Sequence, residues 1–167
     1  MSIQLNHTIV WCRDRQTSAT FFTEVLGLPA PQPFGPFLVV ELSNGVSLDF
    51  YETHGEVASQ HYAFLIAEDD FDQIFSRIRE RGVQYWADPG QRRAGEINRN
   101  DGGRGFYFED PDGHLLEVLT RPYASGDWQN SHPHPAGAGV LRRPMQDGTA
   151  LVLSTLLRRR RATARRA

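Results

Sequence analysis

Residues 102–120 read GGRGFYFEDPDGHLLEVLT, and this stretch decides the fold. Aromatic and branched residues, which favour β-strands, lie on both sides of the turn sequence Asp-Pro-Asp-Gly. In that turn Pro111 presets one backbone angle, Asp112 can bond its own backbone, and Gly113 accepts angles that other residues avoid. The stretch therefore predicts a β-hairpin. Glu117 breaks its apolar pattern in the second strand, and a carboxylate there is costly to bury without a positively charged partner.

The size and composition of the chain suit one domain, or two small modules that share a core. It has 167 residues, of which 40% are hydrophobic and 11% aromatic. No apolar run approaches the roughly 18–20 residues of a membrane span, and the first residues lack the pattern of a secretory signal. The single Cys12 excludes an internal disulfide and is expected to be a small buried hydrophobe. We therefore expect a cytoplasmic protein without a membrane span.

Charge is distributed unevenly along the chain. Up to Arg121 there are ten Arg residues against eighteen Asp and Glu, whereas the remainder has eight Arg residues against two Asp. The body is therefore acidic, and we predict that it does not bind nucleic acid, because such binding needs cations clustered on a folded face. We assign residues 1–122 to the folded domain and expect residues 123–167 to be a basic, disordered tail.

A pattern of one strand, one helix and further strands occurs twice. The first copy covers about residues 3–53: a strand at 5–12, a helix capped by Asp14 and ended by Gly27, a proline-rich connection at 29–36, and strands at 37–42 and 46–52. The second covers about 60–122: a strand at 61–67, a helix capped by Asp69 or Asp70 and ended by Gly82, a short strand at 84–87, a loop at 88–103, and the hairpin. Both copies read as β-α-β-β-β modules.

The two copies carry chemically similar residues at matching places. His7 and His61 each lie in the first strand of a copy, about 20 residues before the glycine that ends its helix. Asp49 and Glu117 each lie four residues after a turn glycine, inside the last strand. Taken singly, each residue is more often a hydrogen-bonded core or edge residue, and Glu117 could pair with Arg104. Their repetition favours a common site.

The opening residues 5–10 (LNHTIV) and the hairpin at 105–117 resemble those of the vicinal oxygen chelate superfamily, which includes glyoxalase I, bleomycin- and fosfomycin-resistance proteins and extradiol dioxygenases. The resemblance covers about residues 3–122 and implies an α+β fold in which two βαβββ modules form an incomplete β-barrel. It further implies one divalent metal ion (Zn, Ni, Co, Mn or Fe), a small-molecule substrate and a homodimer.

By matching positions, the resemblance implies that His7, His61 and Glu117 are metal ligands and that Asp49 stands where some members have a fourth ligand. Asp49 replaces the usual Glu there and is shorter. Imidazoles and carboxylates suit such ions, and the open coordination positions suit catalysis. Glu117 or Asp49 would also serve as the catalytic base of a glyoxalase-type isomerisation.

Four functions remain open for such a site. We expect an enzyme that stabilises an oxyanion on a small substrate with two adjacent oxygens. A glyoxalase-like lyase or isomerase is preferred because of the possible fourth ligand, followed by a dioxygenase and then by an antibiotic-modifying transferase. The alternative from another class is a metal-free binding protein that sequesters a small molecule, as bleomycin-resistance proteins do.

A few other polar residues are secondary candidates. The loop at 88–103 is long enough to be functional, and Asn98, Arg99 or Arg104 are predicted to contact substrate, with a solvated surface loop as the alternative. His114 alternates with Glu117 to the opposite face of the strand, so we interpret it as a residue of the turn side.

Overall fold

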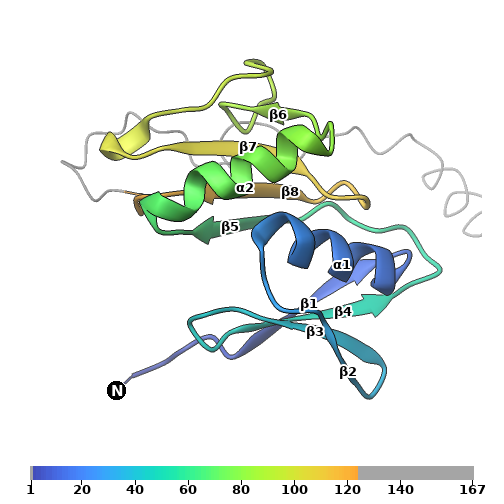
Figure 1. The fold of residues 1–167 in the computed structure, drawn as a ribbon. Helices are drawn as coiled ribbons and strands as arrows, with labels where there is room; N and C mark the ends of the chain where they lie inside the picture. The colour runs from blue at the N-terminus through green and yellow to red at the C-terminus, as the bar shows by residue number, and fades with distance from the viewer. Residues whose placement is uncertain (1, 124–167) are drawn as a thin grey trace, which may run out of the picture.

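The computed structural model describes residues 2–123 and contains two modules of the same topology (Figure 1). The elements of module one are β1 (His7–Cys12), α1 (Arg15–Leu26), β2 (Gln32–Phe34), β3 (Phe37–Glu41) and β4 (Ser47–Glu52). Those of module two are β5 (His61–Leu65), α2 (Glu68–Glu80), β6 (Tyr85–Trp86), the 3-10 turn η1 (Asn100–Gly102), β7 (Gly105–Glu109) and β8 (Leu115–Leu119). The prediction for residues 124–167 lies outside this range.

Each module builds its own four-stranded sheet. The strand orders are β1-β4-β3-β2 and β5-β8-β7-β6, and in each sheet the first strand runs parallel to the last and forms an edge. The two sheets lie on opposite sides of the molecule in Figure 1, where α1 lies between them and α2 is drawn across the sheet of module two. No closed barrel forms within the described residues. The predicted α+β fold of two βαβββ modules is therefore confirmed.

Local signals account for the first helix, and the second differs from expectation. Asp14 accepts a 2.7 Å hydrogen bond from the Thr17 backbone N–H, and Gly27 ends α1 in the left-handed conformation with φ 74°. The predicted cap of α2 is wrong: the helix begins at Glu68, and Ala67 precedes it without a side-chain cap. Three acidic residues in its first turn instead complement the positive end of the helix dipole.

The proline-rich connection conceals a short strand that the sequence did not predict. β2 contains Pro33 and pairs only with β3, at the edge of its sheet. Proline lacks an amide hydrogen and is tolerated on an edge strand, where one side of the backbone has no partner. The proline content therefore obscured a strand whose position allows it.

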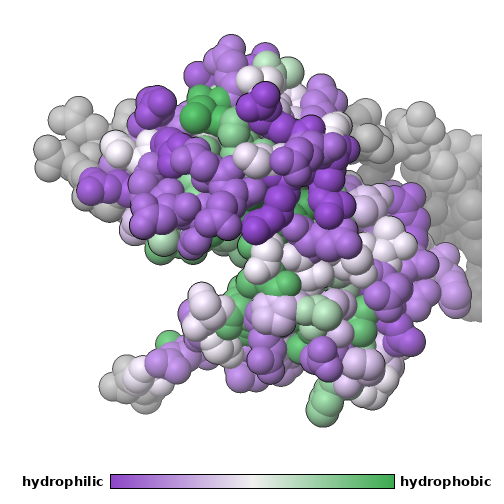
Figure 2. Space-filling view, viewed as in Figure 1, coloured by the Kyte–Doolittle hydropathy of each residue, from purple (hydrophilic) through white to green (hydrophobic). Residues whose placement is uncertain are grey.

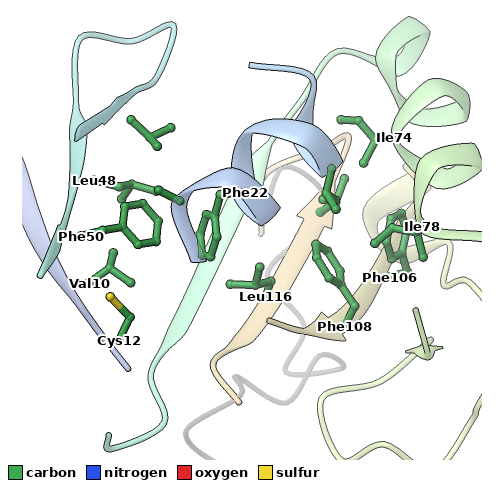
Figure 3. Close-up of a cluster of buried hydrophobic side chains, with 14 of the residues drawn as sticks. Val10, Cys12, Phe22, Leu48, Phe50, Ile74, Ile78, Phe106, Phe108 and Leu116 are labelled. Atoms are coloured by element: carbon green, nitrogen blue, oxygen red, sulfur yellow. The ribbon is translucent and has the colours of Figure 1, made fainter. Parts of the chain in front are cut away.

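One hydrophobic core joins the modules (Figure 3). The ring of Phe22 on α1 packs against rings of both modules. Its centroid lies 5.0 Å from that of Phe50 in β4 and 6.1 Å from that of Phe64 in β5. On the other side, the Phe71 ring of α2 meets that of Phe106 in β7 edge-on. The modules thus share apolar contacts and form one unit.

The hairpin turn of module two also contacts the beginning of module one. Asp112 accepts hydrogen bonds from the Arg13 side chain at 2.7 Å and from the Ser18 hydroxyl at 2.6 Å. Although burial works against ionisation, these bonds hold the pKa of Asp112 below its usual range. Neighbouring Cys12 is fully buried, and burial, with the nearby charge of Asp112, raises its pKa to about 11. Cys12 is therefore the inert core residue that the sequence predicted.

His114 directly follows the turn glycine, on the face opposite Glu117 as the alternation of side chains predicted, and it is fully buried at this joint. Its Nδ1 accepts from the backbone N–H of Gln60 at 3.0 Å. Its Nε2 must then carry the hydrogen, which it donates to the carbonyl of Trp11 at 2.8 Å. The imidazole therefore joins the start of module two to the first strand of module one.

We expect His114→Ala to lower the free energy of unfolding by about 3 kcal/mol, since it leaves a cavity and two unsatisfied backbone groups. Urea unfolding followed by circular dichroism measures the change. His54→Ala is the matched control, because His54 is exposed in the linker between the modules and should change the value by less than about 0.5 kcal/mol. Equal unfolding midpoints for both variants would contradict the proposed joint.

No helix within residues 2–123 is long and apolar enough to cross a bilayer.

Candidate metal centre

His61 and Glu117 lie together on the face of their sheet that points away from the core. β5 and β8 are parallel neighbours, and in their register Ala63 is opposite Glu117. His61, two residues before Ala63, points to the same face because strand side chains alternate. Its Nε2 lies 3.3 Å from Oε2 of Glu117, and the side chains are 23% and 2% exposed. The fold therefore places an imidazole beside a buried carboxylate.

The tautomer of His61 shows what this pair can bind. Its Nδ1 lies 3.0 Å from the backbone carbonyl oxygen of Leu115, which can only accept, so Nδ1 carries the hydrogen. In the neutral ring Nε2 then presents a lone pair to the carboxylate oxygen of Glu117. Two acceptors at this distance need a cation or a proton between them. A second hydrogen bond that orients the ring is typical of histidines that ligate metals, so this donor set fits a divalent ion.

Two tyrosines complete the surroundings of Glu117. The hydroxyl oxygen of Tyr123 lies 2.7 Å from Oε1 and 2.6 Å from Oε2 of Glu117, and 3.0 Å from the hydroxyl oxygen of Tyr107. Burial raises the pKa of both phenols above their usual range, so both remain donors. Because a carboxylate only accepts, Tyr123 donates to Glu117 and Tyr107 donates to Tyr123.

These tyrosines were not predicted from the sequence as part of the site. Tyr107 is the register partner of Glu117 in the hairpin. It lies three residues before Asp110, whereas Glu117 lies four residues after Gly113, so pairing the two strands of the predicted hairpin in this register would have found it. Tyr123 follows the last strand and fell in the segment assigned to the tail, and no sequence signal points to it.

His7 does not join this pair within one chain. It begins β1, the edge strand of the other sheet, and is exposed, and its Nδ1 contacts Oδ1 of Asn6 at 2.8 Å. Among residues 2–123 no group of three His, Cys, Asp or Glu is arranged to hold a metal ion. The structure thus brings together two of the three residues with an implied ligand role, because the first strands of the modules belong to separate sheets.

Asp49 shares the sheet face of His7. In the parallel register, His7 is opposite Ser47 and Ile9 is opposite Asp49, so these side chains point the same way. Oδ1 of Asp49 accepts a 2.8 Å hydrogen bond from the Ser47 hydroxyl. Its roles as fourth ligand and as catalytic base remain predictions.

Two of the three candidate substrate contacts hold the structure together. Arg104 points to α2, where it pairs with Glu68 and with Asp72, the latter at 2.6 Å, and covers the Phe71 ring at 4.1 Å. Arg104 therefore pairs with these two carboxylates. The alternative that it pairs with Glu117 is wrong. Asn98 is buried and bonds the backbone of the neighbouring strand.

Arg99 is exposed on the loop that follows β6. A role in substrate binding therefore remains a prediction for Arg99, while the contacts of Asn98 and Arg104 support structural roles.

Known proteins resemble the chain over the region that contains this pair. The Glyoxalase/Bleomycin resistance protein/Dioxygenase superfamily matches residues 4–118. The glutathione transferase FosA of Serratia marcescens is 34% identical over 120 residues, which are 68% of this chain and 78% of FosA.

Among solved structures, oxidase ChaP-H1 is 63% identical, with a TM-score of 0.73 over 74% of this chain and 99% of that one. Oxidase ChaP-H2 is 62% identical, with a TM-score of 0.74 over 75% of this chain and 99% of that one. The match over residues 4–118 covers the greater part of the chain, which therefore belongs to the Glyoxalase/Bleomycin resistance protein/Dioxygenase superfamily.

Proposed function

We propose that the protein is a metal-dependent oxidase that acts on a small organic molecule with two adjacent oxygens. The observation that carries the proposal is the His61–Glu117 pair, in which Nε2 of the imidazole lies 3.3 Å from Oε2 of the buried carboxylate. The identity of 63% with a protein described as an oxidase supports oxygen chemistry over the other reactions of the family. Two imidazoles and one carboxylate with open positions would suit iron.

The third ligand of this proposed site is His7 of the partner subunit in a homodimer. The sheet of module one has an apolar residue that a partner subunit would cover. Trp11 is 41% exposed on the same face as His7 and Asp49. Leu65, on the edge strand of sheet two, is 59% exposed. Figure 2 shows a notch between the modules with apolar surface inside it. A second copy placed over these edges would cover apolar surface that a monomer leaves in water.

Within this proposal each residue has a defined task. Glu117 would offset the charge of the ion, and His61, oriented by the Leu115 carbonyl, would hold it through Nε2. The bound ion would supply Lewis acidity and a template for adjacent substrate oxygens. The partner subunit's Asp49 would lie on the same sheet face as the partner's His7, where it could accept a proton from the substrate. The hydrogen bond from the Ser47 hydroxyl would hold this carboxylate in place.

The second candidate function is thiol transfer to a small electrophile. It rests on the 34% identity with the glutathione transferase FosA. The sequence-based preference for a lyase depends on Asp49 as a fourth ligand, and among residues 2–123 Asp49 does not join His61 and Glu117 in a group that could hold an ion. The metal-free binding protein has no need for an imidazole nitrogen that lies 3.3 Å from a buried carboxylate.

The proposal is tested by elemental analysis of the purified protein and then by asking whether a small gas can bind to the metal that is found. We expect near-stoichiometric iron in the wild type and little in His61→Ala. Nitric oxide, which substitutes for oxygen at ferrous iron, should then give a new paramagnetic resonance signal in the wild type alone. Glutathione conjugation to fosfomycin with another metal bound would favour thiol transfer. Absence of metal after reconstitution with each ion would leave the binding protein.

A further inference from the structure

We infer that Tyr123 is a cap on Glu117: its hydroxyl occupies the carboxylate where the ion would bind and must turn away before the ion can be held. This inference rests on the metal site proposed above. It adds a residue that follows the last strand and controls how readily the site is filled.

The distances define where the Tyr123 hydroxyl lies. Its oxygen is almost equally far from the two oxygens of Glu117, at 2.7 and 2.6 Å. It therefore lies in front of the carboxylate, between the oxygens, and not to one side of the group. A hydroxyl has one hydrogen, so both oxygens share it. This is the position from which a cation would meet the same two oxygens.

Competition between the hydroxyl and the ion arises at one atom. Oε2 of Glu117 is the oxygen that faces Nε2 of His61, and it is also the oxygen that Tyr123 approaches more closely. An ion held by Oε2 and Nε2 would repel the hydroxyl hydrogen that Oε1 and Oε2 share. Tyr123 must then move to Oε1 alone or leave the carboxylate.

Two features hold the cap in place and one lets it move. The hydroxyl of Tyr107, a buried residue of β7, lies 3.0 Å from the Tyr123 hydroxyl and donates to it. The Glu117 carboxylate is only 2% exposed, so solvent hardly reaches it, and the Tyr123 hydroxyl supplies the hydrogen bond that water would otherwise donate. Tyr123 itself is 37% exposed and follows the last strand, so its ring can swing outward without disturbing the core.

The test is the metal affinity of Tyr123→Phe, which removes only the hydroxyl. The metal-free protein is titrated with ferrous or zinc ion against a chromophoric chelator, and thermal unfolding checks that the fold is intact. We expect about tenfold tighter binding than in the wild type, because one hydrogen bond to a charged group no longer competes. Tyr107→Phe should shift the affinity in the same direction but less, since Tyr123 then loses its support.

Tyr85→Phe is the matched control. The Tyr85 ring packs edge-on against that of Phe75, with centroids 5.0 Å apart, on the helix side of the same sheet. The metal affinity of Tyr85→Phe should therefore equal that of the wild type. Unchanged or weaker binding by Tyr123→Phe, with metal bound by the wild type, would overturn the cap and leave the proposed function intact. If neither protein binds any ion, both proposals fail. Binding by Tyr123→Phe alone would support the cap most strongly.

Discussion

Replacing Glu117 by Gln should lower the metal affinity more than about 100-fold, because changes in groups that only support a ligand already cost 10–100-fold. Gln has the same shape, and its carbonyl oxygen can still accept from Tyr123, so the fold should survive. What is lost is the negative charge that balances the ion beside Nε2 of His61, 3.3 Å from the carboxylate. The measurement is chelator competition with the metal-free protein, together with urea unfolding.

The control for this experiment is Glu109→Gln. Glu109 is also in the hairpin, but it is an exposed residue whose Oε1 accepts from the Gln91 side chain at 2.7 Å. It should bind metal like the wild type. Equal affinities for Glu117→Gln and the wild type would show that the ion, if any, is held elsewhere.

Mixed dimers of two inactive variants should recover activity if each site is built from two chains. His7→Ala and Glu117→Ala damage both sites of their own homodimers. In a mixed dimer, one site receives intact His61 and Glu117 from the first chain and intact His7 from the second. Since half of randomly mixed dimers are heterodimers with one good site of two, about a quarter of the wild-type sites should return.

The pair His61→Ala and Glu117→Ala is the control for complementation. Both substitutions affect the half of the site that one chain supplies, so no mixed dimer contains an intact site. The two variants are refolded together, and bound metal and oxidase activity are measured. Recovery by both pairs, or by neither, would contradict a site completed by His7 of the partner subunit.

The order of elements could be predicted from the sequence because local chemistry carries it. Asp14 caps a helix with its own side chain, and Gly27 and Gly113 adopt backbone angles that favour glycine. The repeat then indicates two modules. Local rules did not reveal β2, because a strand containing Pro33 is acceptable only at a sheet edge, and the edge is a property of the whole sheet.

The sequence by itself determined which residue types could form a site, and the tertiary structure decided which of them meet. The pairing of β5 with β8 places His61 beside Glu117. His7 lies on the edge strand of the other sheet, away from this pair. Arg104 forms ion pairs with carboxylates of α2 and does not contact Glu117. Tyr123 reaches Glu117 only because the chain turns back after β8. Such contacts depend on how the sheets pack, and local sequence patterns carry no information about that packing.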